Sequence, residues 1–351
     1  MSTPQTAPLA TVRSKAFRTL GGPSIDDLTF DDVDVLPPGP GQVAVAIKAV
    51  SLNFRDLAVV TGRYPRPVSG PTVIASDGCG EVVAAGEGVT AFKPGDRVVG
   101  SFFRKWIAGP FAREYGESAL GGAIDGVLTR QRVFDQAGLL RLPEHLTYEE
   151  GATLPCAGLT AWNALVPTAH VEPGNTVLLL GTGGVSIFGL QFAKLHGARV
   201  IITSSSDEKL ERARGLGADE TINYKKNPEW EKEVLRLSGG KGVDIVLEVG
   251  GAETFLRSMG SVRASGQIVV IGVLTGVAGM VPLGLIGLQT LSVRGVYVGS
   301  VGMFEDMNRA LSLHRIRPVV DRVFPFKETP DALRYLQSAQ HFGKVVISLE
   351  N

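Results

Sequence analysis

Apolar positions in the second half of the chain form short runs that alternate with helical spacings. The runs that predict buried strands are 176–180, 199–203, 243–249 and 267–272. Between the first two runs, apolar residues recur on one helix face over 185–196, and a second helix is expected over 207–216. Strands that are apolar throughout, with helices between them, predict a doubly wound parallel sheet of the α/β class.

The first 150 residues have a different pattern, in which short strands are separated by turns. Strand candidates lie at 42–50, 80–86 and 97–100. The chain ends with an expected helix over 303–315, a strand over 319–324, a helix over 330–339 and a strand over 344–349. Because 351 residues exceed what one core usually supports, two domains are expected.

Composition excludes several classes of protein. The 35 basic and 35 acidic side chains give a formal net charge of zero, so no basic surface is expected for nucleic acid or an anionic membrane. Cys79 and Cys156 are the only cysteines, which is too few for a disulfide framework or, by themselves, a zinc site. The expected partner is therefore a small-molecule substrate.

One uncharged stretch, between Arg263 and Arg294, has the length of a membrane span. It contains Pro282 and six glycines, a pattern that predicts a buried strand, a loop and another buried segment rather than a spanning helix. The N-terminus lacks the basic start and apolar core of a signal peptide. We therefore expect a soluble, cytoplasmic protein.

The loop after the first buried strand carries the strongest chemical signal. It reads Gly181-Thr-Gly183-Gly184-Val185-Ser186. In dinucleotide folds the first glycine permits the tight turn, the second lets pyrophosphate approach the backbone, and the helix N-terminus supplies N–H groups. Ser186 replaces the third glycine and is small enough for close helix–strand packing. We predict that Gly181, Gly183, Gly184 and Val185 bind a dinucleotide; a structural glycine turn is the alternative.

The end of the second strand indicates which dinucleotide is bound. An NAD site usually places an acidic residue there, but this chain has Ser204 and Ser205, with Lys209 one turn further. Hydroxyls and an ammonium favour a 2′-phosphate, so NADP(H) is predicted, and a methyltransferase is disfavoured by the same missing acid. Alternatively, Ser205 caps a helix in a capping box that ends at Glu208, and Lys209 is simply solvated.

Several segments together resemble the medium-chain dehydrogenase/reductase superfamily over nearly the whole chain. They are Leu52-Asn-Phe-Arg-Asp56, Gly62-Arg-Tyr-Pro65, Phe92-Lys-Pro-Gly-Asp-Arg-Val98, Cys156-Ala-Gly-Leu-Thr160, the Gly181 loop, Leu216-Gly-Ala-Asp219 and Gly343-Lys344. The resemblance implies a Rossmann dinucleotide-binding domain over 151–295 and a β-rich GroES-like substrate domain over 1–150 and 296–351.

The resemblance also implies further contacts. Tyr224, in Asn223-Tyr224, is expected near the 2′-phosphate, and Thr160 and Lys344 are expected to bind the cofactor. Gly272 opens the glycine-rich segment after the fourth strand, where dinucleotide folds line the nicotinamide pocket. The segment 291–297 is expected to pair with its copy in a homodimer, since such a β-branched edge is otherwise prone to aggregation.

The zinc ligands of the family's alcohol dehydrogenases are mostly missing. Asn53 stands where the first ligand, a cysteine, is expected, and the Ala75-Ser76-Asp77 segment replaces the one that carries the histidine ligand. Only Cys156 remains, and one thiolate cannot hold Zn²⁺. The chain therefore resembles the zinc-independent quinone reductase and enoyl reductase branches, and no metal site is predicted.

Without a Lewis acid, the acceptor must be activated in itself or protonated by a side chain. A quinone or enone fits best, with Asn53 and Tyr64 as candidate catalytic residues among the polar groups of the cleft. Tyr64 is the candidate proton donor, against a packing role; Arg55 and Asp56 are expected to form an internal ion pair. A metal-free alcohol dehydrogenase or ketone reductase, and a non-catalytic NADPH-binding sensor or structural protein, remain alternatives.

Overall fold

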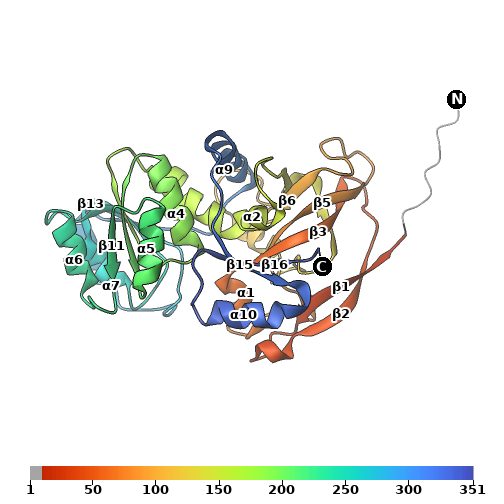
Figure 1. Ribbon diagram of the computed structural model, residues 1–351, viewed down its shortest axis with the longest axis horizontal. Coiled ribbons are helices and arrows are strands. Elements are labelled where there is room, and N and C mark those ends of the chain that lie inside the picture. The colour runs from red at the N-terminus through yellow and green to blue at the C-terminus, as the bar shows by residue number, and fades with distance from the viewer. Residues whose placement is uncertain (1–9, 351) are drawn as a thin grey trace.

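Two sheets with their covering helices make up the protein (Figure 1). The structure, a computed structural model, describes residues 10–350. In Figure 1 the parallel sheet and helices α5, α6 and α7 lie at left, and the antiparallel strands β1, β2, β3, β5 and β6 lie at right. Helices α2 and α4 lie between these two groups of elements.

The parallel sheet has six strands in the order β11-β10-β9-β12-β13-β14. The strands are β9 (Thr176–Leu179), β10 (Arg199–Ser204), β11 (Glu220–Asn223), β12 (Val243–Glu248), β13 (Val262–Val270) and β14 (Ser292–Gly295). Its helices are α4 (Gly184–Leu195), α5 (Asp207–Gly215), α6 (Trp230–Leu237), α7 (Phe255–Ser261) and α8 (Leu283–Leu288). The predicted doubly wound parallel sheet is confirmed, and the four expected strands are β9, β10, β12 and β13.

The second sheet has seven strands in the order β15-β16-β3-β5-β6-β8, with β7 paired to β3. They are β3 (Gln42–Leu52), β5 (Asp77–Ala85), β6 (Arg97–Gly100), β7 (Gln131–Asp135), β8 (Leu139–Arg141), β15 (Val320–Pro325) and β16 (Lys344–Ser348). A small sheet joins β1 (Val12–Thr19), β2 (Thr29–Val35) and β4 (Thr72–Val73). The last strand, β16, pairs antiparallel with β3, so the C-terminal segment returns to the first half of the chain.

Helices join and flank the two sheets. They are α1 (Phe54–Val60), α2 (Tyr148–Ala152), α3 (Leu159–Asn163), α9 (Val301–His314) and α10 (Thr329–Gln337), with the short 3-10 turns η1 (Ile25–Asp27), η2 (Arg113–Ser118), η3 (Gln136–Gly138) and η6 (Phe326–Glu328). Two π-helical turns, η4 (Leu154–Gly158) and η5 (Ala164–Thr168), flank α3. Such turns are frequent at functional sites.

One hydrophobic core continues from the second sheet into the parallel sheet. It includes Phe102 and Phe103 from the β6 side together with Val177 and Leu179 of β9 and Phe188 of α4. Each fully buried large side chain contributes roughly 1.5–3 kcal/mol to folding. The shared core therefore holds the two halves of the molecule against each other.

The uncharged stretch between Arg263 and Arg294 is only partly as expected. Its first part is β13, but the second segment, α8, has no buried residue and Met280 before it is 93% exposed. The prediction of a second buried segment was therefore wrong. Within residues 10–350, no helix is long and apolar enough to cross a membrane.

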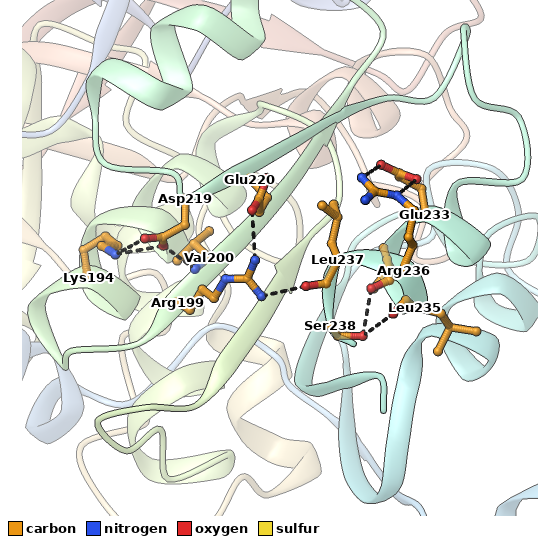
Figure 2. A network of polar contacts seen from close by, with 11 residues as sticks. Lys194, Arg199, Val200, Asp219, Glu220, Glu233, Leu235, Arg236, Leu237 and Ser238 are labelled. Carbon is orange, nitrogen blue, oxygen red and sulfur yellow. Dashed lines mark hydrogen bonds and ion pairs between the residues drawn. The ribbon is translucent and has the colours of Figure 1, made fainter. Parts of the chain in front are cut away.

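A polar network holds the edge of the parallel sheet where β10 begins (Figure 2). The Asp219 carboxylate accepts hydrogen bonds from Lys194 Nζ at 2.8 Å and from the Val200 N–H at 2.7 Å. The Arg199 guanidinium bonds Glu220 Oε1 at 2.9 Å and the Leu237 carbonyl at 3.0 Å. Because these residues lie at the amino ends of parallel strands, the network supports the fold and leaves the opposite edge for ligands.

Candidate active site

The glycine-rich loop lies at the carboxyl edge of the parallel sheet, between β9 and α4. Gly181 has a φ of +71°, and Gly183 is the N-cap of α4. A Cβ built at either glycine would meet no atom within 4 Å, so open space faces the loop. The N–H groups in the first turn of this twelve-residue helix have no partner within the helix and lie at the loop. The loop therefore fits the phosphates of a dinucleotide.

Other residues around the loop pack or hydrogen-bond within the protein. Ser186 is buried and its Oγ donates to the Leu180 carbonyl at 2.7 Å, so it ties α4 to the end of β9. A Cβ at Gly184 would lie 2.6 Å from Lys344 Cδ, whereas Val185 is half-buried. Thr160 is buried in α3.

Gly272, just after β13, is close to the end of β12. A Cβ there would lie 2.3 Å from the Val249 carbonyl oxygen, and its N–H donates to the Glu248 carbonyl at 3.2 Å. Only glycine fits this close approach, so the residue lets the chain turn past the carboxyl edge of the sheet. Its place at that edge agrees with the predicted pocket region.

The residues predicted to hold a 2′-phosphate lie around the end of β10. Ser204 is buried and its hydroxyl is 3.2 Å from Thr182 Oγ1, whereas Ser205 is half-exposed. Tyr224 is 40% exposed, and its N–H donates to the Ser204 carbonyl at 3.0 Å. Lys209 Nζ donates to the Ala339 carbonyl at 2.8 Å. These side chains share one region, with the Ser204 hydroxyl and the Lys209 ammonium already hydrogen-bonded.

Helix α5 begins one residue later than the capping-box alternative expects. Ser206, not Ser205, is the N-cap, and its Oγ accepts from the Lys209 N–H at 3.4 Å. The shift leaves the Ser205 hydroxyl free of a capping role. Sequence reasoning overlooked Asp207, whose carboxylate lies in this region and accepts from Asn223 Nδ2 at 2.7 Å and Lys226 Nζ at 2.5 Å.

The segment between α10 and β16 runs beside the glycine-rich loop. Gly343 forms an isolated bridge with Gly183, and its N–H donates to the Thr182 carbonyl at 3.0 Å. Two residues earlier, His341 is buried enough that its pKa falls to about 4; the ammonium groups of Lys209 and Lys344 act in the same direction. His341 is therefore neutral at pH 7.

A buried cation stands at the centre of the site. Lys344 is 3% exposed, and its Nζ donates to the Leu52 carbonyl at 2.6 Å and to Asn53 Oδ1 at 2.5 Å. Since a carbonyl oxygen only accepts, this contact fixes the Asn53 amide with its NH₂ group directed elsewhere. Asn53 Nδ2 is buried and makes no hydrogen bond with the described residues. The Asn53 side chain also lowers the pKa of Asp77, so its NH₂ group lies toward that carboxylate.

The charge of Lys344 acts on two buried carboxylates, Asp56 and Asp77. Asp77 accepts from Ser76 Oγ at 2.6 Å and from the Cys156 N–H at 3.0 Å. Burial raises the pKa of Asp77, and Lys344 acts against that rise. Burial also raises the pKa of Asp56 to about 6, with Arg55 opposing it.

The residues at the zinc-ligand positions do not fit a zinc ion. Asn53 Oδ1 is bonded to Lys344, Ser76 donates to Asp77, and burial raises the pKa of the Cys156 thiol. Catalytic zinc sites need three protein ligands, with thiols deprotonated. Among residues 10–350 no group of three or more histidine, cysteine or acidic side chains is placed to hold a metal.

Tyr64 contacts Tyr297, a residue for which nothing in the sequence indicated a role in the site. Its hydroxyl lies 2.9 Å from that of Tyr297, which follows β14. The Arg55 guanidinium lies 5.3 Å from the centre of the Tyr64 ring and 3.6 Å from Asp56, so the expected ion pair is present. Tyr297 is 233 positions from Tyr64, so nothing local pointed to the pair.

Comparison with known families covers most of the chain. Residues 39–144 match the alcohol dehydrogenase GroES-like domain, and residues 184–314 match the zinc-binding dehydrogenase family. A zinc-type alcohol dehydrogenase-like protein of Schizosaccharomyces pombe is 45% identical over 89% of this chain and 92% of its own length. A quinone oxidoreductase of Pseudomonas aeruginosa is 34% identical over 90% of this chain and 88% of its own.

Solved structures give the same assignment. An NAD-dependent alcohol dehydrogenase is 35% identical, with a TM-score of 0.86 over 95% of this chain and 99% of its own. The 2-octenoyl-CoA carboxylase reductase CinF, solved with NADP and 2-octenoyl-CoA, is 25% identical, with a TM-score of 0.87 over 97% of this chain and 88% of its own. The chain therefore belongs to the medium-chain dehydrogenase/reductase superfamily and is an oxidoreductase with a GroES-like domain and a Rossmann-like parallel sheet.

Proposed function

We propose that the protein uses NADPH to reduce a quinone, an enone or another activated carbonyl compound without zinc. One observation carries the proposal: the open glycine-rich loop adjoins a buried Lys344–Asn53 pair that stands where the family's zinc alcohol dehydrogenases bind metal. The loop fits a dinucleotide, and Lys344, which packs against Gly184 of the loop, holds the Asn53 amide through its oxygen. The cofactor would therefore bind at the loop, and the acceptor would bind next to it.

The chain's own residues would hold the cofactor in three places. Gly181, Gly183 and the first N–H groups of α4 would bind the pyrophosphate. Ser205, Lys209 and Tyr224 would surround a 2′-phosphate, for which Lys209 Nζ must leave the Ala339 carbonyl. When bound, the reduced nicotinamide supplies a hydride.

NADPH is proposed over NADH because no carboxylate ends β10, and the Asp207 carboxylate nearby is engaged by Lys226 and Asn223. Similar structures include one solved with NADP and one named NAD-dependent, so our choice of NADPH rests on the residues around the end of β10.

The acceptor would lie near Asn53 and Tyr64. Asn53 Nδ2, which lies toward Asp77 but makes no hydrogen bond with the described residues, would bind the acceptor oxygen or the nicotinamide ribose. Tyr64 would donate the proton. In the absence of a fitting zinc site, an acceptor whose developing charge is delocalised needs the least help, which favours quinones and conjugated carbonyls. The similarity to a quinone oxidoreductase supports this choice.

We also propose a homodimer and the domain limits 1–150 with 296–351, and 151–295. Strand β14 is the free edge of the parallel sheet, and Val293 on it is 38% exposed. Beside it, apolar side chains around α8 are exposed, including Met280, Leu283 and Leu288. Pairing of β14 with a second copy would cover this edge.

A metal-free alcohol dehydrogenase or ketone reductase is the second candidate. It is favoured by the 35% identity to a structure named NAD-dependent alcohol dehydrogenase. In that reaction Tyr64 would carry more of the charge stabilisation, because a simple ketone does not delocalise it.

The test is oxidation of NADPH and, separately, NADH at 340 nm by the metal-depleted protein. The acceptors are 1,4-benzoquinone, the linear enone 3-penten-2-one, and a simple ketone. We expect turnover of the first two with NADPH, unchanged after dialysis against EDTA. Turnover of the ketone alone would favour the second candidate, and a preference for NADH would contradict the assignment of Ser205, Lys209 and Tyr224.

A further inference from the structure

Two phenol groups from opposite halves of the molecule meet at the site. Tyr64 follows α1 in the GroES-like half, and Tyr297 follows β14 at the edge of the parallel sheet. Their hydroxyl oxygens are 2.9 Å apart, which is hydrogen-bond distance. Each tyrosine is partly buried, so the pair is neither a core contact nor a freely solvated one.

Contacts place this pair next to the proposed cofactor site. Lys344 packs against Gly184 of the loop and bonds Asn53, the N-cap of α1. Two residues on, Arg55 in α1 lies over the Tyr64 ring. On the other side, the Val296 N–H donates to the Val270 carbonyl, so Tyr297 lies just past the carboxyl ends of β13 and β14.

An aromatic wall holds Tyr297 in place. Its ring centre is 5.0 Å from that of Phe103 and 5.4 Å from that of Phe111, with edge-to-face geometry. Phe103 packs against Trp106, whose ring stacks on Tyr115. Such pairs contribute about 0.5–1.5 kcal/mol each beyond area burial, so this ring is fixed more firmly than that of an isolated surface tyrosine.

Either hydroxyl of the pair can donate to the other. Burial and the neighbouring Tyr64 raise the pKa of Tyr297. With Tyr297 donating to Tyr64 Oη, the Tyr64 proton is free for another acceptor. Arg55, whose Nη2 is buried and unpartnered, lies beside the pair and favours negative charge there.

We propose that Tyr297 is a positioning residue that donates to Tyr64, so that Tyr64 Oη protonates the acceptor oxygen. This inference rests on the proposed function and deepens it. It assigns the site a substrate class: compounds with a conjugated carbonyl oxygen that reaches the hydroxyl pair, as in enones and quinones. Simple olefins lack that oxygen and are excluded.

The proton transfer balances within the pair and solvent. The O–H bond of Tyr64 breaks as an O–H bond forms on the acceptor oxygen, while the acceptor carbon receives the hydride of the proposed reaction. Solvent then returns a proton to the Tyr64 oxygen, while Tyr297 keeps its own proton and continues to donate to that oxygen. The acceptor gains two electrons and two hydrogens, and both tyrosines return to their starting state.

Three variants test the proposal with NADPH and 3-penten-2-one: Tyr64→Phe, Tyr297→Phe and the double variant. General acids contribute on the order of 10²–10⁴ in rate, so Tyr64→Phe should lower kcat about 100-fold. Tyr297→Phe should lower kcat about tenfold with KM for NADPH unchanged, because it acts through Tyr64. In the Tyr64→Phe background, loss of the Tyr297 hydroxyl should have no further effect.

Tyr148→Phe is the matched control, since its hydroxyl bonds Glu81 at 3.3 Å, outside the proposed site. It should keep the wild-type kcat, and thermal unfolding should show that all variants are folded. The proposal is overturned if Tyr297→Phe keeps the wild-type kcat, or if its effect is the same in both backgrounds.

Binding of 1,4-hydroquinone, measured by calorimetry, separates this inference from the proposed function. We expect its Kd to rise about tenfold in Tyr64→Phe and in Tyr297→Phe. If the wild type turns over no acceptor, the proposed function fails, yet tyrosine-dependent hydroquinone binding still supports the acceptor site. Equal hydroquinone affinity in all variants overturns the inference whether or not the wild type is active.

Discussion

Lys344 has two roles at the residue scale. Its Nζ fixes the Asn53 amide through Oδ1, and its charge opposes the desolvation of Asp77. A lysine buried to this extent is costly unless oxygen atoms surround it, and here the Leu52 carbonyl is a second acceptor. The contacts that offset the cost of burying this cation also orient the Asn53 amide.

Removing that cation should cost stability. We expect Lys344→Met to lower the free energy of unfolding by about 3 kcal/mol, since loss of one partner leaves buried charge uncompensated. Denaturant unfolding measures this change. In Lys344→Met/Asp77→Asn, part of the loss should be recovered because the unpaired carboxylate is gone. A loss in the double variant equal to the sum of the two single losses would contradict coupling between Lys344 and Asp77.

At this scale, the sequence predicts features that depend on neighbouring residues but not contacts between residues that are far apart in the chain. The glycine loop and the serines at the end of β10 could be recognised because each depends on adjacent residues, whereas the missing zinc ligands were inferred from the family resemblance. Tyr297 was not, because its role depends on Tyr64, 233 positions away. Lys209 likewise had no sequence signal for its bond to the Ala339 carbonyl.

At the scale of elements, strongly apolar strands were predictable and polar or short ones were not. The four expected strands of the parallel sheet match β9, β10, β12 and β13, since both faces of such strands are buried and the residues are apolar throughout. Strand β2 has no buried residue and carries three aspartates, so its sequence lacks that signal. Strand β11 has only four residues, of which Ile222 alone is apolar, so it also lacks a continuous apolar run.

Helix α8 shows why an apolar segment need not be buried. The sequence Leu283-Gly-Leu-Ile-Gly-Leu predicts burial from composition, yet none of its residues is buried in the single chain. Burial requires a second surface, which composition does not reveal. An exposed apolar element beside the free edge of β14 is consistent with the proposed dimer.

At the scale of the whole molecule, the protonation of His341 makes the free energy of unfolding depend on pH. Its pKa in the folded chain is about 4, below its ordinary value of 6.5, so the unfolded chain binds more protons between these limits. Stability from neutral His341 is present above about pH 6.5 and is lost as pH falls toward 4.

Wild-type protein should therefore lose about 2 kcal/mol more unfolding free energy than His341→Gln between pH 7 and about pH 4.5. Denaturant unfolding at the two pH values measures the difference. The exposed residue His170 supplies the control, because His170→Gln should lose as much as the wild type. If His341→Gln also loses as much as the wild type, His341 is not held neutral by the fold.

The most direct test of the account follows the hydrogen atom itself. Metal-depleted protein would be given NADPH deuterated at C4, in each of its two stereochemical forms, with 3-penten-2-one, and the product analysed by mass spectrometry. We predict that one form transfers deuterium to carbon in the product and that added zinc does not raise the rate. Product without deuterium from either form, or transfer that requires added zinc, would contradict zinc-independent hydride transfer.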